Sequence, residues 1–242
     1  MKWNRLAGCL LLILASCSTR AEPLRICHRG TAGDVPENTV AGIRAAIQCG
    51  CQVVELDVRT TRDGVPVLRH DARLAGLGPI EDLTLDQVVR FRVGNLTAGD
   101  SDDESIPELS RVLREFKGDL LFYLDLKTRN VEAVTSIVRR QTVSTKVLYR
   151  AYLPSQALHL LHLDPDGKVI VDAAILYGSS LWRNRFFNEG PRVVLSVEQR
   201  DLTKELGRFI SRSELPWILN FPAHSALPSA VPPRLWGVLD RF

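Results

Sequence analysis

Short apolar runs alternate with amphipathic stretches along most of this 242-residue chain. The apolar runs cover residues 24–27, 53–58, 65–68, 120–126, 146–151 and 169–175, and helical spacing is found at 40–47, 131–140 and 154–163. Asn38 is placed to cap the first of these helices. Alternation of strand and helix predicts a parallel sheet, which is either an open doubly wound sheet or a closed (β/α)8 barrel. The sequence has no glycine-rich phosphate loop, which disfavours the open sheet.

Polar side chains follow four successive apolar runs, at the point where each run ends. The residues concerned are His28, then Glu55 and Asp57, then His70, and finally Asp125 and Lys127. In a (β/α)8 barrel the carboxyl ends of the strands ring one mouth, and active sites are built there. We therefore predict an α/β fold of the TIM (β/α)8 type, with these side chains around a common site.

The first 16 residues have the charge and length of a signal peptide, and Cys17 follows two small residues at its end. Simple secretion does not require that cysteine, so we favour a lipoprotein signal, with cleavage before Cys17 and lipidation of Cys17. The pattern resembles the lipobox of bacterial lipoproteins, and Ser18 by that resemblance implies the outer membrane, facing the periplasm. We expect residues 1–16 to be removed, 17–23 to form a linker and 24–242 to form the barrel domain.

Charge and cysteine content limit the possible partners. Without the signal, 226 residues remain, enough for one domain, and the net charge falls from +3 to +1. No overall field then attracts nucleic acid, and we expect no nucleic-acid partner. If Cys17 is lipidated, Cys27, Cys49 and Cys51 allow at most one disulfide. Buried apolar cysteines are an equal alternative, and zinc is disfavoured because residues 49–51 have no further ligands nearby.

Two histidines, an arginine and two carboxylates within 44 residues suit chemistry on a phosphate ester. Imidazoles titrate near neutral pH, so His28 and His70 are candidates for proton transfer. Glu55 and Asp57 alternate along one strand and so share a face. Because valines flank the pair, we favour a buried site for one divalent cation, Ca²⁺ or Mg²⁺, over a solvated carboxylate face.

The order of these motifs resembles the glycerophosphodiester phosphodiesterase family, which has a TIM-barrel fold. The matching segments are His28-Arg29-Gly30, Pro36-Glu37-Asn38-Thr39, Glu55-Leu56-Asp57-Val58, residues 61–67 and His70-Asp71. The resemblance is clear over residues 26–127 and looser to about residue 165. It implies hydrolysis of a glycerophosphodiester to glycerol 3-phosphate and an alcohol, with His28 and His70 as the catalytic pair.

The resemblance also implies a third metal ligand, at a position where the family usually has glutamate and this chain has Asp125. Aspartate is one methylene shorter, so we expect a displaced ligand or one that acts through water. Arg29 and Lys127 are suited to binding the substrate phosphate, the arginine through its planar fork and the lysine as a point charge. An ion pair with a structural carboxylate is the alternative for either cation.

The last third of the chain departs from the family. Proline-rich residues 222–233 lie where the last helix is expected, so we predict a truncated or distorted last βα unit. Two alternatives to a phosphodiesterase remain. One is a phospholipase C- or D-like enzyme acting on lysophospholipids or phosphoinositides, which the membrane anchor suggests. The other is a non-catalytic, ligand-binding lipoprotein with a degenerate barrel, which the divergent last strands suggest.

Overall fold

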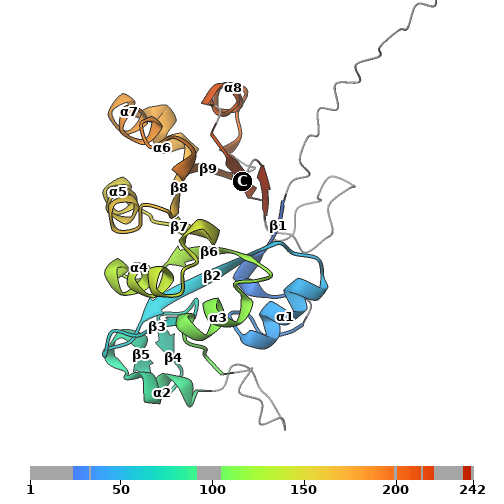
Figure 1. The fold of residues 1–242 in the computed structure, drawn as a ribbon, viewed down its shortest axis with the longest axis vertical. Coiled ribbons are helices and arrows are strands. Elements are labelled where there is room, and N and C mark those ends of the chain that lie inside the picture. The colour runs from blue at the N-terminus through green and yellow to red at the C-terminus, as the bar shows by residue number, and fades with distance from the viewer. Residues whose placement is uncertain are drawn as a thin grey trace, which may run out of the picture.

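The computed structural model describes residues 24–32, 34–91, 105–198, 201–213, 215–220 and 237–240. Eight of the described strands form a closed barrel in the order β1-β11-β10-β9-β8-β7-β6-β2, because β1 pairs with both β11 and β2. Helices lie along the outside of this curved sheet (Figure 1). The fold is an α/β barrel of the TIM type, as predicted.

The element order follows the predicted alternation, except that the strand predicted over residues 169–175 ends at Asp172 and a helix begins at Ala173. The barrel strands are β1 (Leu24–Cys27), β2 (Val53–Thr60), β6 (Leu121–Leu126), β7 (Val147–Arg150), β8 (Lys168–Asp172), β9 (Val193–Glu198), β10 (Trp217–Asn220) and β11 (Gly237–Asp240). The helices are α1 (Val40–Gln48), α2 (Leu85–Val89), α3 (Leu109–Phe116), α4 (Val131–Arg140), α5 (Pro154–Leu163), α6 (Ala173–Gly178), α7 (Ser180–Phe187) and α8 (Lys204–Ser213). An excursion between β2 and α2 contains β3 (Pro66–Leu68), β4 (Arg73–Leu74), β5 (Gly78–Pro79) and the 3₁₀ helix η2 (Ile80–Asp82).

The barrel interior is filled by a ring of apolar side chains, one from each of seven strands. They are Ile26, Val53, Tyr123, Leu148, Ile170, Val194 and Ile218. Side chains alternate between the two faces of a strand, so the residue two positions further along faces the interior again. Those positions hold His28, Glu55, Asp125, Arg150, Asp172 and Ser196, of which Asp172 turns away to cap α6. A polar layer therefore lies next to the apolar ring, at the carboxyl ends of the strands.

A larger apolar core lies between the barrel and its helices. The outward-facing residues Leu56 of β2 and Phe122 of β6 are buried in it, together with Leu113 of α3 and Val134 of α4. Each of these helices turns one apolar stripe toward the sheet. Burial of apolar area at roughly 25 cal/mol per Å² is the main term that holds helices and barrel together.

The third predicted strand, β3, is not a barrel strand, which corrects the sequence analysis. It pairs antiparallel with β2, with Thr60 opposite Pro66. A turn reverses the chain after β2, and Gly64 in this turn has a φ of +81°. Because β3 runs back along β2, its end returns to the barrel mouth, where the Arg69 N–H donates to the Asp57 carbonyl at 2.9 Å.

The last βα unit is distorted, as predicted. β11 runs antiparallel to both of its neighbours, β1 and β10, whereas a regular (β/α)8 barrel has a parallel eighth strand. The predicted proline-rich break at 222–233 lies outside the described residues, and so do the signal peptide, Cys17 and the linker. Within the described part of the chain, the helices are too short or too polar to cross a bilayer.

One disulfide is present among the described cysteines. It joins Cys27, at the end of β1, to Cys51, just before β2, with a Cα–Cα distance of 6.0 Å. Cys49 is free and exposed. Of the two alternatives for these three cysteines, the structure therefore contains the disulfide.

Candidate active site

Three carboxylates from two neighbouring strands meet at the carboxyl end of the barrel. Glu55 and Asp57 lie on β2, and Asp125 lies opposite Asp57 on β6 in the parallel register. One oxygen atom of each residue lies within 4.8 Å of those of the other two. Glu55 and Asp57 are buried and Asp125 is partly buried. The structure thus brings together the three residues that the sequence predicts as metal ligands, including the shorter Asp125.

The charge balance of this carboxylate cluster fits a divalent cation. Lys127 supplies one positive charge, with its Nζ 2.7 Å from Asp125 Oδ2 and 3.5 Å from Asp57 Oδ1. Burial and the Asp57 carboxylate raise the pKa of Glu55 well above its usual value. Asp125 Oδ1 is buried and has no hydrogen-bond partner among the described residues. Oxygen donors with excess negative charge and an unsatisfied buried lone pair suit a hard cation such as Mg²⁺ or Ca²⁺.

Asn38 orients one of the carboxylates. Its Nδ2 donates to Asp57 Oδ2 at 2.9 Å, and the Asp57 N–H donates to Asn38 Oδ1 at 3.0 Å. The φ of Asn38 is +55°, a left-handed conformation that asparagine tolerates. This corrects the predicted helix cap, because Thr39 caps α1 instead, its Oγ1 accepting from the Gly42 N–H at 3.0 Å. The prediction was wrong because it considered only the position of Asn38 just before an expected helix.

Arg29 lies at the cluster but is already engaged by a carboxylate. Its backbone N–H donates to Glu55 Oε2 at 2.7 Å. Its guanidinium Nη1 donates to both oxygens of Glu37, at 2.9 and 2.8 Å, and its Nε lies 3.9 Å from Asp57 Oδ2. Arg29 thus forms an ion pair with a carboxylate, which was one prediction for it. It also faces the cluster, which is compatible with the other prediction, binding of the substrate phosphate.

The two predicted catalytic histidines come from different segments. His28 Nε2 lies 3.7 Å from Glu55 Oε2. Burial and the neighbouring charge of Arg29 lower the pKa of His28 to about 4, so its imidazole is neutral at pH 7. His70 Nδ1 contacts Asp71 Oδ1 at 3.0 Å, so Asp71 orients this ring. His70 is one of the neighbouring groups that contribute to the lowered pKa of His28, so the two rings belong to one site.

Tyr152 joins the cluster although the sequence analysis did not single it out. Its hydroxyl donates to Asp125 Oδ2 at 2.9 Å and accepts from Lys127 Nζ at 2.6 Å. Burial opposes the charge of Lys127, but the hydrogen bonds to Asp125 and Tyr152 outweigh it and raise the pKa of the ammonium. Lys127 is therefore a fixed cation at physiological pH.

Arg150 is a second residue that was missed. Its Nη1 donates to the Tyr123 hydroxyl at 3.2 Å and to Ser196 Oγ at 3.0 Å, inside the polar layer of the barrel. Burial opposes its charge, but Tyr123 and Asp125 raise the pKa of the guanidinium. The two-residue alternation along β7 could have identified Arg150 from the sequence, because it places Arg150 on the same face as Leu148 and one layer above it.

Comparisons with known proteins agree on one family. Residues 28–152 match the model of the Glycerophosphoryl diester phosphodiesterase family. The chain is 33% identical over 153 residues to human glycerophosphodiester phosphodiesterase 1. The aligned segment covers 58% of this chain and 46% of the human protein. The matched segments span between 33% and 46% of the first four curated relatives, all mammalian proteins of this name.

Solved structures share the barrel. A phosphodiesterase from Oleispira antarctica, in complex with the product sn-glycerol-3-phosphate, has a TM-score of 0.65 at 24% identity, covering 83% of this chain and 84% of that one. A glycerophosphoryl diester phosphodiesterase from Parabacteroides distasonis has a TM-score of 0.65 at 23% identity, covering 81% and 70%. At these identities the likeness establishes the fold.

Proposed function

The chain belongs to the glycerophosphoryl diester phosphodiesterase family, and on this premise we propose that it hydrolyses a glycerophosphodiester to glycerol 3-phosphate and an alcohol. The observation that carries the proposal is the assembly of three carboxylates, two imidazoles and two cations at one barrel mouth. The Oleispira antarctica phosphodiesterase supports it, because that protein holds sn-glycerol-3-phosphate as its product.

The cluster Glu55, Asp57 and Asp125 would hold one Mg²⁺ or Ca²⁺. Support comes from the oxygen-only donor set and from the unpartnered Asp125 Oδ1. When bound, such a cation supplies neutralisation of the charge on the phosphoryl oxygens. Asn38 would keep Asp57 in place for this role, through the paired hydrogen bonds described above.

The protein groups around the cluster divide the proton transfers. His28 is neutral at pH 7, so it accepts a proton from the water molecule whose oxygen forms the new bond to phosphorus. His70, held by Asp71, gives a proton to the leaving alkoxide. Each such transfer is typically worth ~10²–10⁴-fold in rate. Lys127 and the guanidinium of Arg29, whose Nη1 stays with Glu37, would hold the phosphate oxygens during both transfers.

A metal-removal experiment tests this function. Release of glycerol 3-phosphate from glycerophosphocholine and glycerophosphoglycerol is measured for wild type and His28→Ala, with and without EDTA. Activity should disappear in EDTA, return with Mg²⁺ or Ca²⁺, and fall by about 10²-fold or more in His28→Ala. His159→Ala is the control, because this exposed histidine on α5 pairs with Glu132 on α4.

The contrary outcomes identify which part of the proposal fails. Full activity in EDTA contradicts the metal role. Folded wild-type protein that hydrolyses no phosphodiester contradicts the enzyme and favours the ligand-binding lipoprotein. Cleavage of lysophospholipids or phosphoinositides in preference to water-soluble diesters favours the phospholipase.

We also propose that the protein is a lipoprotein of the bacterial cell envelope, anchored through Cys17 to the outer membrane and facing the periplasm.

A further inference from the structure

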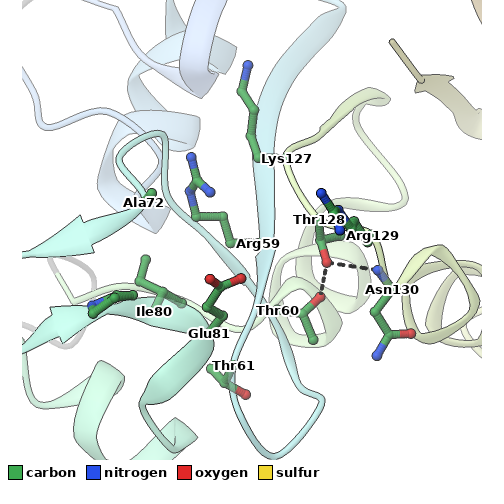
Figure 2. Close-up of a pocket in the computed structure, with 11 residues that line it drawn as sticks. Arg59, Thr60, Thr61, Ala72, Ile80, Glu81, Lys127, Thr128, Arg129 and Asn130 are labelled. Atoms are coloured by element: carbon green, nitrogen blue, oxygen red, sulfur yellow. Dashed lines mark hydrogen bonds between the residues drawn. The ribbon is translucent and has the colours of Figure 1, made fainter. Parts of the chain in front are cut away.

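A cleft of about 600 Å³ opens beside the carboxylate cluster, between the ends of β2 and β6 and the excursion that carries η2 (Figure 2). Lys127 belongs to both the cleft and the carboxylate cluster, since it lines the cleft and its Nζ contacts Asp125. The cleft is therefore within reach of a substituent of a phosphodiester held at Lys127. The volume lies in the range of whole small-molecule sites and is more than a glycerol unit needs.

The cleft is rich in positive charge. Its lining contains Arg59, Lys127 and Arg129, with Glu81 as the one acidic residue among the described lining. Neither Arg59 nor Arg129 forms an ion pair within the described part of the chain. Figure 2 shows the side chains of Arg59 and Lys127 extending in the same direction. Lys127 is paired with Asp125, and Asp57, Asp71, Glu81 and Asp125 act on the charge of Arg59. The unbalanced positive charge of the lining therefore lies at Arg129, where it favours an anionic ligand.

One of the cations, Arg59, is held in place before any ligand arrives. Nε and Nη2 of Arg59 both donate to the carbonyl of His70, at 3.0 and 2.6 Å, which fixes the guanidinium. In the opposite wall, Thr60 Oγ1 donates to Thr128 Oγ1 at 2.8 Å, and the Asn130 N–H donates to the same oxygen at 3.1 Å (Figure 2). A fixed guanidinium loses little conformational entropy when it binds a carboxylate or phosphate.

Two further features bear on the sign of the ligand charge. The ten-residue helix α4 begins at the cleft, where Asn130 caps it by accepting from the Ala133 N–H at 3.1 Å, and a helix N-terminus carries partial positive charge. The described lining has no aromatic side chain, whereas sites for a quaternary ammonium are typically built from aromatic rings. Both features disfavour a cationic alcohol such as choline.

We propose that this cleft binds the alcohol portion of the diester and selects alcohols that carry a second anionic group, a carboxylate or a phosphomonoester. The inference rests on the proposed function, because it names the substrate class of the same site. Arg59 and Arg129 bind the second anion through charge-assisted hydrogen bonds, while Lys127 remains with the phosphodiester.

Two matched substrate pairs test the inference. Glycerophosphoserine differs from glycerophosphoethanolamine by one carboxylate, and glycerophosphoglycerol phosphate differs from glycerophosphoglycerol by one phosphomonoester. The wild-type kcat/KM should be about tenfold higher for the anionic member of at least one pair, and this preference should shrink with added salt. The pair that shows the preference identifies the anion.

Variants assign the preference to the cleft. Arg129→Gln should reduce the ratio within the pair to about twofold or less, and Glu81→Gln should increase it. Both side chains are exposed, so folding is not at issue. Arg212→Gln, on α8, removes an equal charge elsewhere and should leave the ratio and the activity at wild-type values.

The outcomes separate the two proposals. An active enzyme with no preference in either pair overturns the inference and leaves the proposed function standing. A preference that is unchanged in both Arg129→Gln and Glu81→Gln also overturns it, because selection then lies outside the cleft. Hydrolysis of none of the four diesters overturns the proposed function and the inference with it.

Discussion

Glu55→Gln should stabilise the metal-free protein even though it removes a candidate metal ligand. Glu55 is 1% exposed, and its carboxylate lies within 4.8 Å of those of Asp57 and Asp125. At an effective dielectric constant of about 20, two carboxylates at that distance repel by about 3.5 kcal/mol. Lys127 and partial protonation relieve most of this repulsion, so we expect a gain of about 1–2 kcal/mol in the free energy of unfolding.

A saturating divalent cation should reverse the order of the two proteins. Metal at a hundred times its Kd stabilises wild type by about 2.7 kcal/mol, and Gln is a weaker ligand than carboxylate. Thermal unfolding in EDTA should therefore give Glu55→Gln a Tm about 2–8 °C above wild type, and added Mg²⁺ or Ca²⁺ should place wild type above the variant. The exposed Glu205→Gln, on α8, is the control and should change stability by no more than about 0.5 kcal/mol.

The gain should also depend on pH. Because the pKa of Glu55 is raised in the folded protein, the folded state binds more protons than the unfolded chain above the ordinary glutamate pKa of about 4.3. Metal-free wild type therefore loses stability as pH rises through that window, and the variant does not. The difference should vanish near pH 4 and grow toward pH 8. A variant less stable than wild type in EDTA at pH 8 would refute the reasoning.

Three further predictions concern the surroundings of the site and the N-terminus. Asn38→Ala should weaken metal binding by about 10–100-fold, because Asp57 loses its paired hydrogen bonds, and calorimetric affinity unchanged from wild type would contradict this. Cys51→Ser opens a crosslink between residues 24 positions apart, so chemical denaturation should show a loss of about 3 kcal/mol relative to oxidised wild type, and equal midpoints would contradict a native Cys27–Cys51 disulfide. Cys17→Ala should abolish fatty-acid labelling and release the protein from the membrane fraction, whereas retained labelling would exclude lipidation at this residue.

The barrel and most of the cluster were predictable because their signals are local. Apolar runs of strand length alternate with helical spacing, and the barrel strands β1, β2, β6 and β7 and the helices α1, α4 and α5 follow this pattern. Glu55 and Asp57 stand out because they interrupt a valine-rich strand at alternate positions. A carboxylate in such a setting is either paired or bound to a cation, whatever the rest of the fold.

The remaining features depend on contacts between distant segments. Asn38 looks like a helix cap in the local sequence, yet its partner Asp57 is 19 residues away. The direction of β3 depends on how its turn folds back against β2, which a short apolar run does not encode. Arg150 carries the same two-residue alternation as Glu55, but its role depends on Tyr123 and Ser196 from other strands.

The candidate site lies on β2 and β6 and on the segments that follow β1 and β3, so the last βα unit can diverge without altering it. The candidate catalytic and metal-binding residues lie between positions 28 and 127, inside the segment that matches the family, and β8–β11 follow that segment. Strands β8, β9 and β10 support the site through the apolar ring inside the barrel. For this role each strand needs one apolar side chain at the ring position and no particular polar group. Antiparallel β11 satisfies the backbone of β1 and β10 through its own ladders, so closure of the barrel does not need a parallel eighth strand.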